Sequence, residues 1–117
     1  MVYQCRNDAR HTIEFASKGC YDLTGYQPDD LVLNRATPYG DLIHPDDRET
    51  VWSSIQTAIK KQKSFELIYR ITTRDGHEKW VRELGASVFG SNGNSHLLEG
   101  FITDITEWKL AEKQIQR

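Results

Sequence analysis

The sequence predicts an α+β domain in which five strands form one antiparallel sheet and helices group on one face of that sheet. Alternating apolar and polar residues, a pattern typical of half-buried strands, occur in two segments near the start of the chain and in three near its end. The residues between these two groups carry the start and stop signals of helices. Runs of strands joined by short turns form antiparallel sheets, which helices cover on one face.

The first two strands are expected at residues 2–6 and 11–17. In the second strand, Ile13 and Phe15 alternate with polar residues, so we expect them to share one face. Only a short polar turn separates the two strands, which indicates that they pair as a hairpin.

Short helices and one long helix are expected next. Gly25 ends the first short helix, and Pro28 begins another helical turn. The long helix is expected to begin at Pro45 with His44 as its cap residue, because acidic residues fill its first turn and lysines its last. Its apolar face consists of Val51, Trp52, Ile55, Ala58 and Ile59.

Three more strands are expected within residues 64–73, 79–89 and 98–104. The pair Asp75 and Gly76 marks a tight hairpin between the first two of them. The element order is therefore two strands, short helices, a long helix, three strands and a final helix.

The final helix begins after Asp104, where the apolar period changes from that of a strand to that of a helix. Asp104 and Glu107 have the D-x-x-E spacing of a capping box, and Thr106 is a second candidate cap. The apolar stripe of this helix is thin and consists of Trp108, Ala111 and Ile115. The helix is either a well-capped end of the domain or the start of a dimeric coiled coil that leads to a further domain.

Composition narrows the range of functions. The 117 residues fit one domain with one core, and the net charge of −2 offers no basic surface for nucleic acid or an anionic membrane. No apolar run approaches the roughly 20 residues of a membrane helix, and the first residues lack the apolar region of a signal peptide. Cys5 and Cys20 form no metal or redox motif. We therefore expect a cytoplasmic domain that binds neither nucleic acid nor membrane.

The element order and four sequence segments together resemble the PAS domain, including its C-terminal PAC half. The segments are FAS…CYDLTGYQPDDLV, LIHPDDRE, FELIYRITTRDGHEKWV and LEGFITDITEWKLAE. The subclass that they resemble is common in bacterial sensor histidine kinases and cyclic-dinucleotide signalling proteins. The resemblance implies the spatial strand order 2-1-5-4-3 and a sensing or interaction role instead of catalysis. It also implies a sensor domain at 1–105, without the usual N-terminal helix of the family, and the start of a signalling helix at 106–117.

The cofactors of the resembled family can be tested residue by residue. Its flavin photosensors need a cysteine after the segment DDLVLNRA, where this chain has Thr37 or its neighbours, and no cysteine follows Cys20. Members that bind haem need a histidine on the long helix, which has none after His44. We therefore expect neither flavin nor haem, while an unidentified small organic ligand is compatible with the family. The histidines show no metal-ligand spacing, so no metal site is expected.

The candidate ligand site is the space between the sheet and the helices. The residues expected to line it are Phe15, Tyr21, Tyr26, Leu31, Ile43, Trp52, Ile55, Leu67, Tyr69, Leu84, Leu98 and Ile102. Gly100 removes a side chain from the middle of the sheet, which suits a small ligand or a few waters. The alternative is a filled core, because such large side chains pack to nearly crystalline density.

Arg82 shares its side of the strand with Trp80 and Leu84. If that side faces the core, Arg82 is a ready carboxylate-binding group in the cavity. If it faces outward, Arg82 is a plain surface residue. Both remain open, because PAS sheets often bury part of their outer face against flanking helices.

These observations favour a PAS sensory or dimerisation module within a longer signalling protein, either a histidine kinase or a diguanylate cyclase. Its state is expected to reach an output domain in the same chain through the junction Asp104-Ile105-Thr106, in a homodimer formed by flanking helices. A ligand-free relay between proteins is the second hypothesis. The third, from another class, is a small α+β enzyme that uses His44 with Asp46 or Asp47 as an acid–base pair.

Overall fold

The computed structural model describes the backbone of residues 1–89 and 96–115 and the side chains of residues 1–88 and 97–112. Its strands are β1 (Val2–Arg6), β2 (Ile13–Ala16), β3 (Phe65–Thr72), β4 (Glu78–Phe89) and β5 (His96–Asp104). Its helices are α1 (Gly19–Thr24), α2 (Pro28–Leu31), α3 (Tyr39–Leu42), α4 (Pro45–Lys60) and α5 (Thr106–Ile115).

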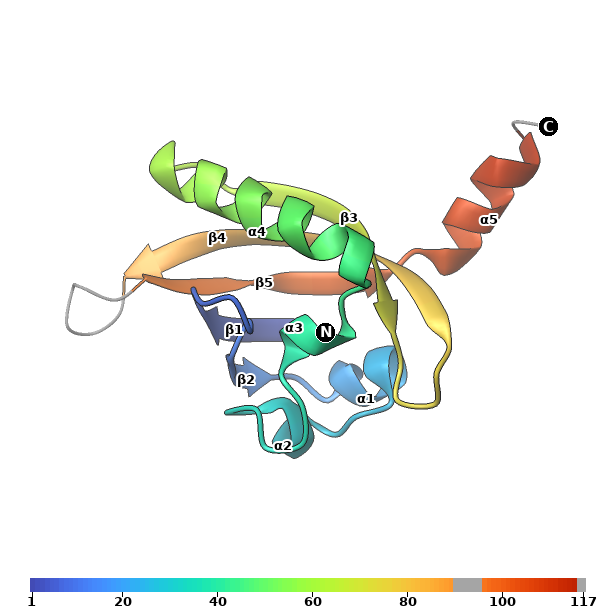
Figure 1. Ribbon diagram of the computed structural model, residues 1–117, viewed down its shortest axis with the longest axis horizontal. Coiled ribbons are helices and arrows are strands. Elements are labelled where there is room, and N and C mark those ends of the chain that lie inside the picture. Colours follow the sequence, from blue (N-terminus) through green and yellow to red (C-terminus); the bar gives the residue numbers. More distant parts are fainter. Residues whose placement is uncertain (90–95, 116–117) are drawn as a thin grey trace.

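All five strands belong to one antiparallel sheet with the order β2-β1-β5-β4-β3. The predicted strand order is thereby confirmed. The last strand, β5, lies in the centre of the sheet, and α5 leaves directly from its end. In Figure 1, α4 lies along the sheet while α5 projects away from the body of the domain.

Helix α4 begins where the sequence predicts. Pro45 is its first residue, and Nδ1 of His44 accepts a hydrogen bond from the backbone N–H of Asp46 at 3.1 Å. Val51 and Ile55 are buried against the sheet and confirm the predicted apolar face. Trp52 departs from that prediction: it is only half-buried, because its position on the helix lies at the flank of the buried stripe.

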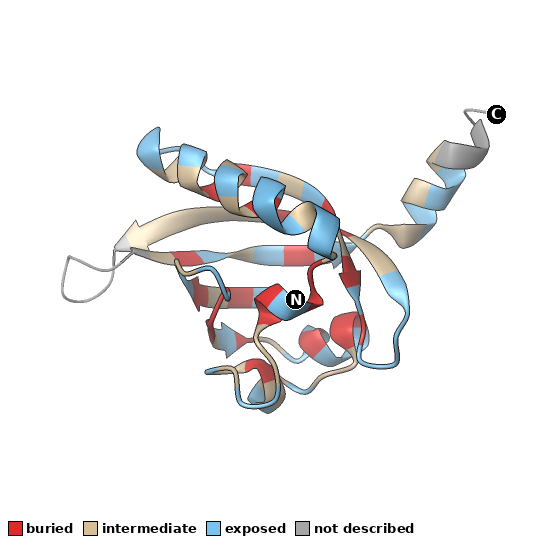
Figure 2. Cartoon of the chain, viewed as in Figure 1, coloured by how far each residue is buried: buried red, intermediate tan, exposed pale blue. Residues whose placement is uncertain are grey.

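The short helices are joined to the sheet through backbone pairing. Ile13 of β2 forms an isolated bridge with Val32 after α2, and Ile43 after α3 forms another with Ile71 of β3. Figure 2 shows buried positions along β1 and on the short helices that face it. The core therefore lies between one face of the sheet and the helices.

A β-bulge between β1 and β2 reverses the facing predicted for Phe15. Gln4 pairs with Phe15, but Cys5 pairs with Ile13, so Glu14 is an extra residue in β2. The bulge turns Ile13 into the core while Phe15 points outward, with 54% of its surface exposed. The prediction that Phe15 lines the interior is therefore wrong.

Candidate functional site

The centre of the interior is a buried carboxylate held by tyrosines, which we call the Glu83 network (Tyr3, Tyr39, Tyr69 and Glu83). Glu83 lies on β4 and is only 5% exposed. Tyr69 of β3 donates to Oε1 of Glu83 at 2.6 Å, and Tyr3 of β1 donates to Oε2. The hydroxyl groups of Tyr39 and Tyr69 lie 2.8 Å apart. One side chain thus joins two strands and, through Tyr69, helix α3.

Two glycines lie beside this network, and Gly85 makes room for it. Gly85 of β4 and Gly100 of β5 are paired across the sheet, and Gly100 is paired in turn with Tyr3. A Cβ on Gly85 would lie 2.6 Å from the Tyr3 hydroxyl and 2.7 Å from the Phe65 ring. A Cβ on Gly100 would instead collide with the backbone of Leu84 and Gly85, so Gly100 permits the close approach of β4 and β5 and does not leave the predicted space for a ligand.

The hydrogen bonds of the network suit an ionised Glu83. Three phenol protons serve three contacts when Tyr3 and Tyr69 donate to the carboxylate and Tyr39 donates to Tyr69. A proton on Glu83 would add a fourth hydrogen to the same three contacts. Burial nevertheless raises the pKa of Glu83, and the bonds from the two tyrosines only partly offset this. Burial and the Glu83 charge also raise the pKa values of Tyr39 and Tyr69, which keeps both as proton donors.

Glu83 is not among the predicted site residues, because the sequence leaves the facing of this strand open and Arg82 is the only polar candidate predicted on it. Val81, Glu83 and Gly85 face the core, while Arg82 and Leu84 face outward. Nη2 of Arg82 donates to Glu66 at 2.8 Å on that outer side, and Arg82 is a surface residue. The inclusion of Arg82 and Leu84 in the cavity is corrected accordingly. The sequence signal that could have placed Glu83 in the interior is the pair of apolar and glycine neighbours, Val81 and Gly85, on the same side of the strand.

The remaining candidate lining residues divide into three groups. Fully buried residues are Leu31, Ile43, Ile55, Tyr69, Leu98 and Ile102. Tyr26 and Leu67 are partly buried and pack against this core, whereas Trp52 lies at its margin. Tyr21 is 51% exposed, because α1 turns Cys20, Leu23 and Thr24 inward and Tyr21 away. The prediction for Tyr21 is therefore wrong.

The junction between β5 and α5 is a compact hydrogen-bonded unit. Oδ1 of Asp104 accepts from the backbone N–H of Thr106 at 2.9 Å and from its hydroxyl at 2.6 Å. Oγ1 of Thr106 accepts from the backbone N–H of Trp80 at 3.0 Å, and the N–H of Ile105 donates to the Trp80 carbonyl at 2.9 Å. The first turn of α5 is therefore bonded both to its own strand and to β4.

Lys79 connects this junction with α1. Its Nζ donates to the carbonyl oxygens of Asp22 and Leu23 at 2.9 and 3.0 Å, and lies 3.7 Å from Oδ2 of Asp104. Partial burial raises the pKa of Asp104, but the bonds from Thr106 and the charge of Lys79 outweigh it and lower that pKa overall. Asp104 is thus held as a carboxylate at the start of α5, where a negative charge is favourable.

The predicted capping box of α5 is not formed. Asp104 receives the cap bond, as predicted, but Glu107 is exposed and makes no bond back to Asp104 among the hydrogen bonds described. On the same helix, Trp108 is 55% exposed and Ala111 is exposed as well. Ile115 ends α5, and its side chain lies outside the described residues. The stripe of α5 therefore faces solvent where it is described.

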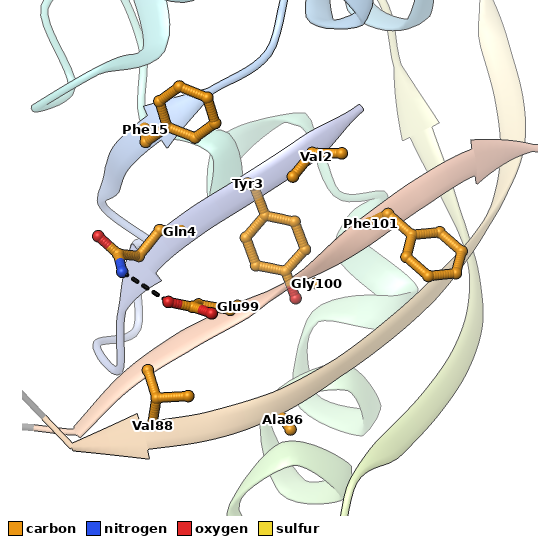
Figure 3. A pocket seen from close by; sticks show the side chains of 9 residues that line it. All are labelled: Val2, Tyr3, Gln4, Phe15, Ala86, Val88, Glu99, Gly100 and Phe101. Atoms are coloured by element: carbon orange, nitrogen blue, oxygen red, sulfur yellow. Dashed lines mark hydrogen bonds between the residues drawn. The ribbon is translucent and has the colours of Figure 1, made fainter.

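The outer face of the sheet, which points away from α4, carries exposed apolar side chains and two hollows. The first hollow has a volume of about 600 Å³, and its apolar lining side chains are Val2, Phe15, Ala86, Val88 and Phe101. Figure 3 shows these side chains around it, with the bond from Gln4 to Glu99 at one side. The second hollow, of about 490 Å³, lies between β3, β4 and α5 and is lined by Glu66, Ile68, Arg82, Ile105 and Trp108.

His44 is positioned as a helix cap. Its Nδ1 accepts the Asp46 N–H, and Nε2 lies 3.9 Å from Glu78 near the surface. Asp47 pairs with Arg70. The proposed acid–base pair requires His44 to point into the interior, so this arrangement does not support it.

No group of three or more potential metal ligands occurs among the described residues. Within the same residues, no helix is long and apolar enough to span a membrane.

An antiparallel sheet in this order, with helices on one face and an exit helix from its central strand, is the architecture of the PAS fold. The family model described as PAS fold matches residues 13–102. The chain belongs to this family.

Curated relatives of this chain include a sensor and a histidine kinase. A methyl sulfide methyltransferase-associated sensor of Methanosarcina acetivorans is 28% identical over 116 residues, which are 98% of this chain and 11% of that protein. A blue-light-activated histidine kinase of Brucella anthropi is 36% identical over 72 residues, 62% of this chain and 14% of the kinase. The chain thus spans a small part of these relatives, between 11% and 14% of their length.

Solved structures agree on the fold. A sensory box histidine kinase/response regulator from Burkholderia thailandensis superimposes with a TM-score of 0.74 at 22% identity, over 98% of this chain and 83% of that one. The N-terminal domain of a diguanylate cyclase with a PAS/PAC sensor from Marinobacter aquaeolei gives 0.73 at 22% identity, over 92% and 96%. Histidine kinases and diguanylate cyclases therefore contain domains similar to this one.

Proposed function

We propose that this PAS domain is a non-catalytic sensory and dimerisation module of a cytoplasmic, multidomain signalling protein of the histidine kinase or diguanylate cyclase type. Residues 1–105 form the sensor, and residues 106–117 begin the helix that leads to an output domain in the same chain. The observation that carries the proposal is the bonding of Thr106 to both Asp104 and Trp80. Through these bonds a shift of β4 or β5 moves the start of α5.

The structure of the interior favours a domain that responds to a protein partner over one that binds a small molecule. Tyr3, Tyr39 and Tyr69 meet at Glu83 between the sheet and the helices and satisfy its oxygens. The hydrogen-bonding groups at the centre of the interior therefore bind one another, which leaves Glu83 without a need for a ligand as partner. We expect purified protein to be colourless and native mass spectrometry to find the unliganded mass. A stoichiometric flavin, haem or other organic molecule would contradict this.

A second copy of the chain is the proposed partner at the outer face. Val2, Phe15 and Phe101 are exposed on adjacent strands of that face, and Trp108 of α5 lines the hollow beside them. Exposed apolar patches of this kind mark interaction surfaces. The two hollows lie on the same face of the sheet, and Trp108 of the α5 stripe lines one of them, which favours a homodimer in which two copies of α5 pair as the sheets meet.

The junction is tested in the full-length protein with Asp104→Ala and Thr106→Ala. Loss of a cap should lower the free energy of unfolding by about 0.5–2 kcal/mol, which leaves the domain folded. Basal output should shift and its response to the input should weaken. Glu107→Ala is the matched control, because Glu107 stands in the same turn and makes no bond to the junction among the hydrogen bonds described. Unchanged output and regulation in both junction variants would reduce the junction to a helix cap.

A further inference from the structure

Both the backbone N–H and the side chain of Arg70 hold this residue to the start of α4. Nη2 and Nε of Arg70 donate to the carboxylate of Asp47 at 2.7 and 3.0 Å, and the backbone N–H of Arg70 donates to it at 2.9 Å. A planar guanidinium with two bonds to one carboxylate has a defined orientation. The guanidinium of Arg70 therefore moves with the first turn of α4.

Trp80 of β4 contacts both the guanidinium of Arg70 on the neighbouring strand β3 and a lysine of α5. Arg70 and Trp80 are directly paired between β3 and β4, and the guanidinium carbon lies 5.5 Å from the centre of the indole ring. Nζ of Lys109, in the first turns of α5, lies 4.7 Å from the centre of the same ring. Both distances lie within the range of cation–π attraction. One ring thus contacts a cation from β3 and a cation from α5.

The backbone of Trp80 makes the same connection independently. Its N–H donates to Thr106 and its carbonyl accepts from Ile105. The junction therefore holds the backbone of Trp80 in place. A rotation of α5 about the junction moves Lys109 relative to the Trp80 ring. Asp47, Arg70, Trp80 and Lys109 form a continuous series of contacts from α4 to α5, which we call the indole relay.

We propose that Trp80 is a positioning residue that couples the start of α4 to the orientation of α5 through the indole relay. This inference rests on the proposed function of the junction and adds a second input to it, from the long helix. A change at α4 that loosens Asp47 frees Arg70, which alters the contact between the ring and Lys109. The Arg70 and Trp80 side chains lie on the side of β3 and β4 opposite to Tyr69 and Glu83, and Asp47 of α4 meets Arg70 at the edge strand β3, so the relay is separate from the Glu83 network.

A double-mutant cycle measured by amide hydrogen exchange of α5 tests the relay. Asp47→Asn and Lys109→Met are each expected to raise exchange in α5 about two- to fivefold, the range of one cation–π contact near the surface. Because both changes break the same series, the double variant should exchange no faster than the faster single variant. Multiplication of the two factors would overturn the relay, since independent sites are additive in free energy.

Two controls separate the relay from other causes. Glu66→Gln loosens Arg82, a second outward arginine with a carboxylate partner, and its effect should combine multiplicatively with Lys109→Met. In a Trp80→Leu background the coupling of Asp47 and Lys109 should vanish, and in Trp80→Phe, which keeps an aromatic ring, part of it should return. Coupling that persists in Trp80→Leu would assign it to direct charge attraction and overturn the role of Trp80.

Failure of this inference is distinguishable from failure of the proposed function. If the cycle is multiplicative while Thr106→Ala still disturbs output of the full-length protein, the junction transmits without the relay. If Thr106→Ala leaves output unchanged, the proposed function fails whatever the cycle gives.

Discussion

The hydroxyl of Thr106 accepts the backbone N–H of Trp80 at 3.0 Å, and this bond fastens the first residue of α5 to strand β4. The same hydroxyl donates to Asp104 at 2.6 Å, so a single side chain connects β4, β5 and the exit helix. A thin amphipathic helix of ten residues is marginal by itself in water. Its orientation therefore depends on these bonds and on whatever covers its apolar stripe.

The first prediction concerns pH and Glu83. Its pKa is raised above the ordinary value of 4.5, so between pH 4.5 and that raised pKa the folded state holds more protons than the unfolded state. The contribution of Glu83 to stability is therefore complete below about pH 4.5 and is lost as the pH rises towards the raised pKa. Glu83→Gln, which does not titrate, should lack this loss. Denaturation of both proteins across this range checks it, and parallel stability curves would contradict it.

The second prediction concerns the donors of the same network. Tyr3→Phe removes the hydroxyl that donates to Glu83 and leaves a buried carboxylate oxygen without that partner. The free energy of unfolding should fall by about 1–3 kcal/mol. Tyr21→Phe is the matched control, because Tyr21 is exposed, and should change it by less than about 0.5 kcal/mol. Equal effects in urea denaturation would show that Tyr3 has no special role.

The third prediction ranks two aromatic side chains. Phe65 is buried beside Gly85, so Phe65→Ala should lower the free energy of unfolding by about 3–5 kcal/mol. Trp52 lies at the margin of the core, so Trp52→Ala should cost clearly less. Chemical denaturation of both variants measures the difference. A cost for Trp52→Ala equal to or above that for Phe65→Ala would place Trp52 inside the core.

The fourth prediction concerns the outer face. Phe101→Gln removes a side chain that is 46% exposed in the centre of the proposed dimer surface. The dissociation constant of the homodimer should rise at least about tenfold, as expected for loss of a central aromatic contact. Tyr21→Gln changes a similarly exposed aromatic residue away from that face and should leave the constant unchanged. Sedimentation at several concentrations distinguishes the two, and equal behaviour would contradict the proposed surface.

Local signals explain why much of the fold was predictable. The start of α4 is encoded in neighbouring residues, His44 and Pro45, and the hairpin between β3 and β4 in Asp75 and Gly76. The sheet order was implied by the family resemblance and not by spacing. Phe15 was mispredicted because alternation assumes a regular ladder, and the bulge at Glu14 breaks it.

The facing of β4 required information that no local pattern contains. Each side of the strand includes two charged residues, Glu78 and Arg82 on one and Lys79 and Glu83 on the other, so charge alone does not distinguish the two sides. Glu83 faces inward because tyrosine hydroxyls from β1 and β3 converge there, and these residues are distant in sequence. Burial of a charge is tolerated only with such partners, so the partners decide the facing.

The most direct test of the junction is amide hydrogen exchange of α5 in Thr106→Val. Valine keeps the shape of threonine but removes the oxygen that accepts from Trp80 and the proton that Asp104 receives. We predict faster exchange of the amides of α5 and unchanged exchange in the central part of β3, β4 and β5. Exchange of α5 that equals that of the unchanged protein would contradict the claim that these bonds hold the exit helix to the sheet.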